Sequence, residues 1–260
     1  MAIPRVLILR AAGTNCDEET QFAWSLAGAA ATRAHINRLV EQPGRLSDYQ
    51  ILTIAGGFSY GDDIASGTVF AQQLRRHLAA ELAAFVAGGG LVLGICNGFQ
   101  VLVKAGLLPG PGLPPVTLMM NDSGRFEARW VTMRAGKSSC PLFEPGETLS
   151  LPIAHAEGKF VIGTGPGGER GPSAVAMLES AGCLALRYFN AENGLSDGPY
   201  NPNGSEGDIA GVCDASGRVF GLMPHPERFV RAEQRPDWTR VGNTEIDGLR
   251  FFRRAVARFR

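Results

Sequence analysis

One cysteine stands where the surrounding residues favour a nucleophile. Cys96 lies in the segment GICNGFQ, directly after the apolar run Leu91–Ile95. Gly94 and Gly98, two positions to either side, remove side chains that would clash in a tight strand–turn–helix. Backbone N–H groups at the start of such a helix favour a thiolate and a developing oxyanion. An isolated cysteine after a strand is more often a small buried residue, but the two glycines and Gln100 favour the nucleophile.

Two His–Glu pairs are candidates for the base that such a cysteine needs. The segment PHPE, which holds His225 and Glu227, follows the apolar run Val219–Met223. In a tight turn this carboxylate can accept a hydrogen bond from the imidazole and fix its tautomer. His155 and Glu157 form a rival pair with the same spacing. Periodicity does not choose between the two pairs.

A glycine pair is a candidate for the oxyanion hole. The segment AGGFSYGD follows the strand-like run Ile51–Ile54. The carboxyl ends of parallel strands meet at one edge of a sheet, so we expect Gly57 to lie near Cys96. Its N–H can then approach a tetrahedral oxygen, with the N–H of Asn97 as its partner. Taken alone, the segment is equally consistent with a structural Gly-Gly turn.

Strands that alternate with helices must position these residues. Over the first hundred residues we expect strands at 5–9, 33–36, 51–54 and 91–95. We expect one helix capped by Asn15 or Thr14, a second with apolar residues at helical spacing along 74–85, and a third after Cys96. This alternation predicts an α/β fold with a mainly parallel sheet. Further strands are expected at 126–133, 149–154, 174–178, 184–189, 209–213 and 219–223, with a hairpin turn at 214–217 and an Arg-rich helix over 246–259. The sequence contains no internal repeat, so we expect one domain over residues 1–260.

Composition excludes several classes of protein. The 260 residues hold 25 Lys and Arg against 25 Asp and Glu, so charge predicts neither nucleic-acid nor membrane binding. The start has no signal-peptide pattern, which predicts a cytosolic protein. Five cysteines without C-x-x-C spacing argue against a disulfide framework or a cysteine zinc site; they are Cys16, Cys96, Cys140, Cys183 and Cys213.

Two glycine-rich matches to nucleotide motifs fail. Gly163–Gly168 fits G-x-G-x-x-G, but Pro166 and Pro172 bracket it and no helical period follows. Gly136-Lys137-Ser138 lacks the upstream glycine of a phosphate loop. We therefore expect no ATP site of that kind in this chain.

Taken together, GICNGFQ, GGFSYGDD and PHPER resemble the class I (triad) glutamine amidotransferases. The segments GTNCD, IAHAEG and NPNGS are similar to the subgroup of glutaminase subunits of phosphoribosylformylglycinamidine synthase. The resemblance spans residues from about 5 to 255. Ala55, Asp63-Ile64, Ala156 and Lys159 depart from the usual residues of the pattern, but the thiol, imidazole and carboxylate are intact.

The resemblance implies a flavodoxin-like fold with helices flanking a mainly parallel sheet, and it implies a reaction. Cys96 would attack the side-chain carboxamide of L-glutamine, while the N–H groups of Gly57 and Asn97 stabilise the oxyanion. His225, oriented by Glu227, would protonate the departing ammonia and then activate water. Gln100 is a candidate for holding the glutamine, and no metal is expected at this site.

The same resemblance implies partners. Ammonia would pass to a separate ATP- and Mg-using synthetase subunit, which converts formylglycinamide ribonucleotide to the amidine in de novo purine biosynthesis. A small third subunit would bridge the two, and this chain itself would carry no cofactor. His155, Glu157, the Asn201–Ser205 loop and the Arg-rich C-terminal helix are candidates for the docking surface, although that helix is equally consistent with a solvated charged face.

Two other classes remain as alternatives. One is a stand-alone cysteine hydrolase or stress protein of the related cysteine-elbow fold, which Gln100 and PHPE disfavour. The other is a regulatory subunit that has kept only the fold. Cys16 lacks flanking elbow glycines, so we expect it to have a structural role in a turn rather than to act as a second nucleophile.

Overall fold

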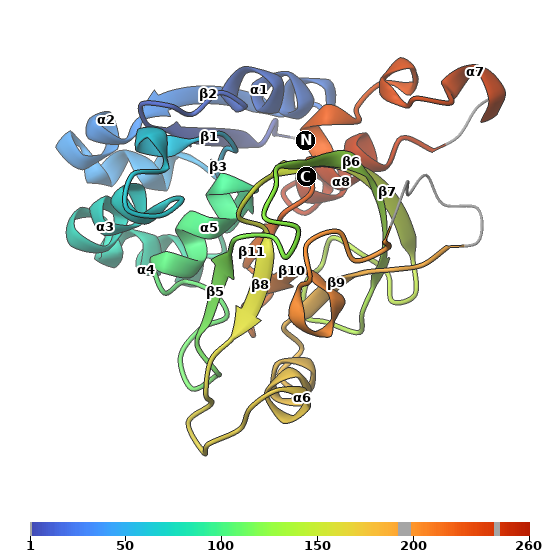
Figure 1. The fold of residues 1–260 in the computed structure, drawn as a ribbon. Helices are drawn as coiled ribbons and strands as arrows, with labels where there is room; N and C mark the ends of the chain where they lie inside the picture. The colour runs from blue at the N-terminus through green and yellow to red at the C-terminus, as the bar shows by residue number, and fades with distance from the viewer. Residues whose placement is uncertain (1, 192–198, 242–244) are drawn as a thin grey trace.

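A nine-stranded sheet forms the centre of the protein (Figure 1). The computed structural model describes residues 2–191, 199–241 and 245–260. The strands of this sheet follow the order β2-β1-β3-β4-β11-β10-β9-β6-β7, and a separate two-stranded sheet pairs β5 with β8. In the part of the chain that is described, no helix is both long and apolar enough to cross a membrane.

The elements have the following bounds. The strands are β1 Arg5–Arg10, β2 Ala30–His35, β3 Ile51–Ile54, β4 Leu91–Ile95, β5 Val116–Met119, β6 Glu127–Ala135, β7 Thr148–His155, β8 Lys159–Ile162, β9 Leu184–Tyr188, β10 Ile209–Cys213 and β11 Val219–Leu222. The α-helices are α1 Asp17–Leu26, α2 Ile36–Glu41, α3 Thr68–His77, α4 Ala79–Ala87, α5 Asn97–Lys104, α6 Pro172–Ser180, α7 Trp238–Val241 and α8 Asp247–Ala257. Short 3₁₀ turns are η1 Pro43–Asp48, η2 Ser59–Asp62, η3 Glu206–Asp208, η4 Pro226–Arg228 and η5 Ala232–Gln234.

The strands from β2 to β11 are parallel to their neighbours in the order β2-β1-β3-β4-β11. Helix α1 covers one side of this part of the sheet and α3–α5 cover the other (Figure 1). Every residue of β3 and β4 is buried, which explains why these strands are continuous apolar runs rather than alternating ones. The α/β fold expected from the sequence is confirmed.

The remaining strands are antiparallel. Strands β10 and β11 form the expected hairpin at 214–217, and β9, β6 and β7 extend the sheet beyond β10. Strand β7 alternates buried and half-buried residues from Leu149 onward, as a strand with one face on the core does. Hence the sheet is parallel from β2 to β11 and alternates in strand direction from β11 to β7.

Three local expectations need correction. Residues 174–178, expected as a strand, lie in helix α6, because Pro172 opens the first turn and Ala174 and Leu178 bury the same face at helical spacing. Helix α1 begins after Cys16 without the side-chain cap expected from Asn15 or Thr14. The periodic segment 74–85 is divided between α3 and α4, since Leu78 leaves helical geometry with φ −134°.

Two glycines allow α5 to lie directly against the sheet. A Cβ on Gly94 would stand 2.6 Å from the carbonyl oxygen of Gly98, and one on Gly98 would overlap the carbonyl oxygen of Ile54 in β3. Both contacts involve backbone atoms, which cannot rotate away as a side chain can. The glycines around Cys96 are therefore required by packing as well as by the turn.

We predict that Gly98→Ala lowers the free energy of unfolding by about 3 kcal/mol, because α5 must move off β3. Urea denaturation followed by circular dichroism measures this change. Gly44→Ala is the matched control, since a Cβ there meets nothing within 4 Å. Equal stability of the two variants would contradict the close-packing argument.

Candidate active site

The ends of three neighbouring strands bring the candidate residues together. Ile54 of β3 pairs with Gly94 of β4, and Ile95 of β4 pairs with Leu222 of β11. The glycine pair, Cys96 and the PHPE segment each follow one of these strand ends by a few residues. Because the strands are parallel, all three segments lie at the same edge of the sheet.

Cys96 occupies the turn between β4 and α5 in a strained conformation. Its φ of 51° and ψ of −106° lie outside the regions that non-glycine residues usually adopt. The residue is 6% exposed, and its Sγ lies 3.8 Å from the backbone oxygen of Ala154 in β7. A strained, nearly buried cysteine at the start of a helix fits the nucleophile predicted from the sequence.

His225 and Glu227 form a buried pair. His225 Nδ1 and Glu227 Oε1 are 2.6 Å apart, and the two side chains are 2% and 0% exposed. The backbone N–H of His225 donates to the carbonyl oxygen of Pro152 at 2.8 Å, which ties the turn to β7. The tight turn expected to bring the imidazole and carboxylate together is thus present as η4.

The charges around His225 favour its protonated form. Burial by itself lowers the pKa of the imidazole, but the Glu227 carboxylate and the Cys96 thiol act in the opposite direction and raise it well above its ordinary value. The arrangement therefore supports an imidazolium next to the Cys96 sulfur, oriented by a carboxylate.

The rival pair is arranged differently. His155 Nδ1 lies 3.1 Å from Asn121 Oδ1, while the Glu157 carboxylate accepts a hydrogen bond from the Ser66 N–H at 3.3 Å. Burial, with the charge of His225, lowers the pKa of His155 to about 3, so this ring is neutral. The geometry therefore favours His225 and Glu227 as the partners of the thiol.

The loop of the predicted oxyanion hole is held by the segment before α1. Gly57 has φ 135° and bridges Thr14, and a Cβ on Gly57 would stand 2.6 Å from the backbone nitrogen of Asn15. Asn97 opens α5, and its side-chain oxygen accepts the N–H of Ser59 at 3.2 Å. These contacts hold the loop of Gly57 against both the segment before α1 and the start of α5. The role of the Gly57 and Asn97 N–H groups toward an oxyanion stays a prediction.

Gln100 connects α5 to the segment after β7. Its Nε2 donates to the carbonyl oxygen of Glu157 at 2.6 Å, and its Oε1 accepts from Asn97 Nδ2 at 2.9 Å. The side chain is buried, and both ends of its amide are engaged within the protein. The structure thus shows a scaffolding contact for Gln100, and its predicted contact with glutamine stays a prediction.

The expected docking surface needs correction in part, since Arg253 of α8 is exposed and Glu157 is half-buried, and these two stay candidates. His155, Asn203 and Ser205 are buried; Asn203 donates to the carbonyl oxygen of Gly158 at 2.9 Å, so the loop packs inside the chain. In α8, Arg250 and Arg254 both pair with Glu147 and are not free for a partner. Sequence reasoning missed this because the partners are distant along the chain.

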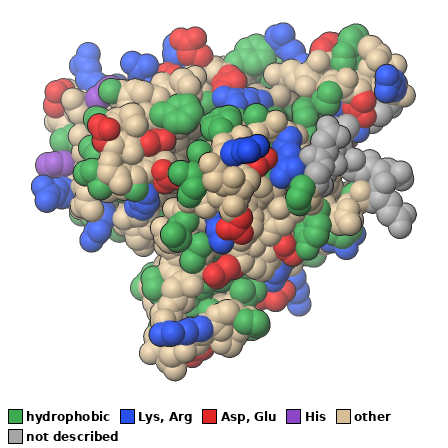
Figure 2. All heavy atoms as spheres, in the orientation of Figure 1, with side chains coloured by type: hydrophobic (Ala, Val, Ile, Leu, Met, Phe, Trp, Pro, Cys, Tyr) green, Lys and Arg blue, Asp and Glu red, His purple; other side chains and the backbone are tan. Residues whose placement is uncertain are grey.

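The view of the surface in Figure 2 agrees with the balanced composition. Basic and acidic side chains are interspersed over this face, with hydrophobic atoms between them. No broad region of a single charge is visible on this face, in keeping with the equal numbers of basic and acidic residues.

Cys16 lies at the site, which its position in the sequence did not indicate. Its sulfur, a ring nitrogen of His225 and a carboxylate oxygen of Glu227 lie within 4.8 Å of one another. Arg228 Nη2 donates to the sulfur at 3.2 Å, and burial raises the pKa of the thiol to about 11. Cys16 is therefore a protonated thiol beside the His225–Glu227 pair, and only the GTNCD motif could have suggested it.

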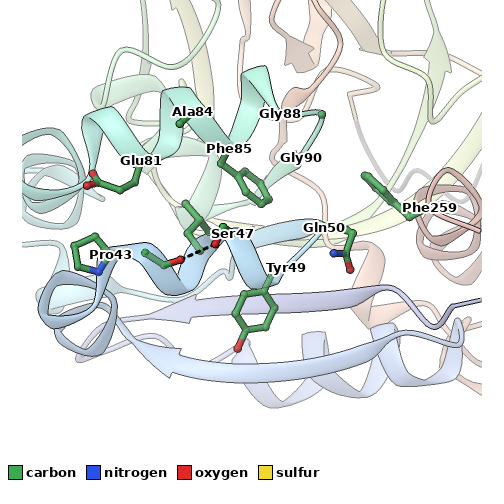
Figure 3. Close-up of a pocket in the computed structure, with 13 residues that line it drawn as sticks. Pro43, Ser47, Tyr49, Gln50, Glu81, Ala84, Phe85, Gly88, Gly90 and Phe259 are labelled. Carbon is green, nitrogen blue, oxygen red and sulfur yellow. Dashed lines mark hydrogen bonds between the residues drawn. The ribbon is translucent and has the colours of Figure 1, made fainter.

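A large cavity lies elsewhere in the molecule. It has a volume of about 530 Å³ and lies between η1 and α4, with Tyr49, Phe85 and Phe259 among its lining residues (Figure 3). None of the candidate site residues lines it. The cavity therefore has no direct part in the chemistry at Cys96.

Comparison with known proteins identifies the family. Residues 3–259 match the model of the CobB/CobQ-like glutamine amidotransferase domain. The chain belongs to this family. It is 45% identical to phosphoribosylformylglycinamidine synthase subunit PurQ of Dehalococcoides mccartyi over 98% of each chain, and 38% identical to that of Archaeoglobus fulgidus over 97% of this chain and 96% of the relative.

Solved structures agree with this assignment. A chain in the structure of PurLQS from Thermotoga maritima is 31% identical and superposes with a TM-score of 0.74, covering 100% of both chains. A glutamine amidotransferase of the same organism, 15% identical, superposes with a TM-score of 0.54 over 100% of this chain and 98% of its own, which shows a shared fold. The amidotransferase fold expected from the motifs is confirmed.

We predict that Glu227→Gln slows alkylation of Cys96 by iodoacetamide at neutral pH by about tenfold or more, the effect of one pKa unit. The carboxylate raises the pKa of His225, so its loss lets the ring deprotonate at lower pH and removes the charge that stabilises the thiolate. Alkylation rates are measured by mass spectrometry across a pH series. The rates of the variant and the wild type should differ most at pH values between the pKa of His225 in the variant and its pKa in the wild type.

Glu233→Gln is the control for this change. It removes an exposed negative charge close to the site without contacting the imidazole. We expect its alkylation profile to match that of the wild type. If Glu227→Gln also matched the wild type, the carboxylate would have no part in activating Cys96.

Proposed function

We propose that this chain is the glutaminase subunit of phosphoribosylformylglycinamidine synthase, with Cys96, His225 and Glu227 as its catalytic residues. The observation that carries the proposal is the buried His225–Glu227 pair, 2.6 Å apart, beside a strained cysteine at the same sheet edge. A relative named as subunit PurQ of this synthase matches 98% of the chain, which supports the assignment of the reaction.

The chemistry proceeds through a thioester. The Cys96 thiolate attacks the carboxamide carbon of L-glutamine, and a tetrahedral oxyanion forms toward the N–H groups of Gly57 and Asn97. His225 gives its proton to the nitrogen, and ammonia leaves as the C–N bond breaks. The neutral imidazole then takes a proton from water, which attacks the thioester and releases glutamate, while Cys96 leaves as thiolate.

The oxyanion donors offer a point of control. One such donor contributes about 3–4 kcal/mol to the transition state, so a small displacement of Gly57 silences the site. Phe58, directly after this glycine, and Ile64, two residues beyond η2, are 45% and 90% exposed. Exposed apolar side chains beside the loop support a contact with the synthetase subunit that adjusts the donors.

The ammonia passes to an ATP-dependent synthetase subunit, which converts formylglycinamide ribonucleotide to formylglycinamidine ribonucleotide. The name PurLQS of the solved Thermotoga maritima structure supports an assembly with other subunits. We further propose a small bridging subunit, ATP and Mg²⁺ in the synthetase rather than in this chain, and a cytoplasmic location. A stand-alone cysteine hydrolase has less support, because the full-length relatives are named as subunits.

The test uses Cys96→Ala in the complex reconstituted with its synthetase. We expect glutamine-dependent synthesis to fall by about 10⁴-fold or more, because no thioester can form, while ammonia-dependent synthesis persists. In the wild type, 6-diazo-5-oxo-norleucine should label Cys96, as read by peptide mass mapping. Cys183→Ala, a buried thiol outside the site, is the control and should keep both activities.

Two outcomes would overturn the assignment. Label at any residue other than Cys96 would move the nucleophile elsewhere. Unchanged glutamine-dependent synthesis by Cys96→Ala would favour a regulatory subunit that has kept only the fold.

A further inference from the structure

The group of Cys16, His225 and Glu227 has the composition of a metal site. A thiol sulfur, an imidazole nitrogen and a carboxylate oxygen lie within 4.8 Å of one another, and all three residues are buried. Sulfur, nitrogen and oxygen ligands of these kinds are the set that Zn²⁺ takes in proteins. Ligand distances of about 2.0–2.3 Å place the donor atoms about 3.5 Å apart, so shifts of about 1 Å bring them around one ion.

Two of these residues have a spare donor atom. Glu227 uses Oε1 for the imidazole, while its Oε2 and the Nε2 of His225 are buried without a hydrogen-bond partner among the described residues. Buried polar atoms of this kind are costly unless something binds them. The carboxylate can therefore accept a cation without first giving up a bond from Oε2.

A hollow next to the cluster offers a cation a route to it. The hollow has a volume of about 820 Å³, is lined by Glu18, Glu19, Glu233 and Arg231, among others, and reaches Glu227. The Glu227 side chain is fully buried, so it lies beneath the floor of the hollow rather than in it. Glu18 and Glu19 already pair with arginines, so the hollow contributes access to Glu227 rather than an excess of negative charge.

Arg228 places a positive charge near the cluster, which opposes the binding of a cation, but two of its contacts reduce this repulsion. Its Nε pairs with Glu19 at 3.0 Å, and its Nη2 donates to the Cys16 sulfur at 3.2 Å. A metal-bound thiolate still accepts this hydrogen bond, and such outer contacts orient metal ligands.

We propose that Cys16, His225 and Glu227 bind a thiophilic divalent cation such as Zn²⁺, and that the bound ion holds the glutaminase inactive. The thiol proton of Cys16 and the Nε2 proton of the His225 imidazolium leave to solvent as the metal–sulfur and metal–nitrogen bonds form. An imidazole whose Nε2 ligates the ion cannot transfer protons for Cys96, even though Glu227 binds the ion through Oε2 and keeps Oε1 on the ring. The inhibitory half of the proposal rests on the proposed function, whereas the binding half does not.

Binding is tested with the Cys96→Ala chain, in which the nucleophile cannot be a ligand. Co²⁺ should produce a near-ultraviolet thiolate charge-transfer band. Zn²⁺ should displace the Co²⁺ and abolish the band, and competition with a chelator measures the affinity for Zn²⁺. Adding Cys16→Ser should abolish the band and weaken Zn²⁺ binding by about 100-fold or more. Adding Cys183→Ser instead should change neither, and circular dichroism verifies that each variant is folded.

Absence of the band in Cys96→Ala would overturn the site, as would equal Zn²⁺ affinity with and without Cys16→Ser. If Cys16→Ser fails to fold, Cys16→Ala provides the same comparison. Loss of binding in Cys183→Ser would place the ion at a different thiol and would also overturn the proposal.

Inhibition is tested in the reconstituted complex. Zn²⁺ should suppress glutamine-dependent synthesis while sparing ammonia-dependent synthesis, and a zinc-selective chelator should restore the loss. Full glutamine-dependent synthesis at saturating Zn²⁺ would contradict the inhibitory half alone. A complex that never hydrolyses glutamine, even free of metal, would contradict the proposed function and the inhibition with it, while the binding result would stand.

Discussion

The arrangement of the candidate site depends on a charge pair held away from water. His225 and Glu227 are almost completely buried, and removing an imidazolium from solvent is unfavourable unless a carboxylate compensates for it. Here the carboxylate is 2.6 Å away, and the neighbouring Cys96 adds to the same effect. The ring therefore keeps its proton where a lone buried histidine would lose it. His155 illustrates the opposite case, since burial without such a partner lowers its pKa to about 3.

The sheet makes this arrangement possible by placing distant segments in register. Ile95 and Leu222 are paired residues of adjacent parallel strands, although more than a hundred positions separate them in the sequence. The residues that follow these strand ends start from neighbouring points, so one short elbow and one tight turn suffice to bring thiol and imidazole together. The glycines of the elbow have a second use, because they let α5 lie on β3. Chemistry and packing thus constrain the same few positions.

Sequence reasoning found the parts of the site that are encoded locally. The apolar runs before Cys96 and His225 predicted strands, and the glycines around Cys96 predicted an elbow, because short-range sterics determine both features. Sequence reasoning failed where contacts between distant segments determine the local structure. The segment 174–178 has apolar residues that fit a strand or a helix, and packing of one face selects α6. The location of Cys16 beside His225 depends on the fold of the whole chain, and so does the burial of the 201–205 loop.

Strand β7 belongs to the antiparallel half of the sheet, yet it borders the cysteine elbow directly. The carbonyl oxygens of Pro152, Ala154 and Glu157, on β7 and just beyond it, meet His225, Cys96 and Gln100 in turn. The candidate site thus lies at a seam between the parallel and the antiparallel parts of the sheet, with backbone of β7 forming one wall. A fragment that kept only the parallel strands β2-β1-β3-β4-β11 would lose this wall. Any engineered shortening of this amidotransferase has to preserve β7 and its support from β6.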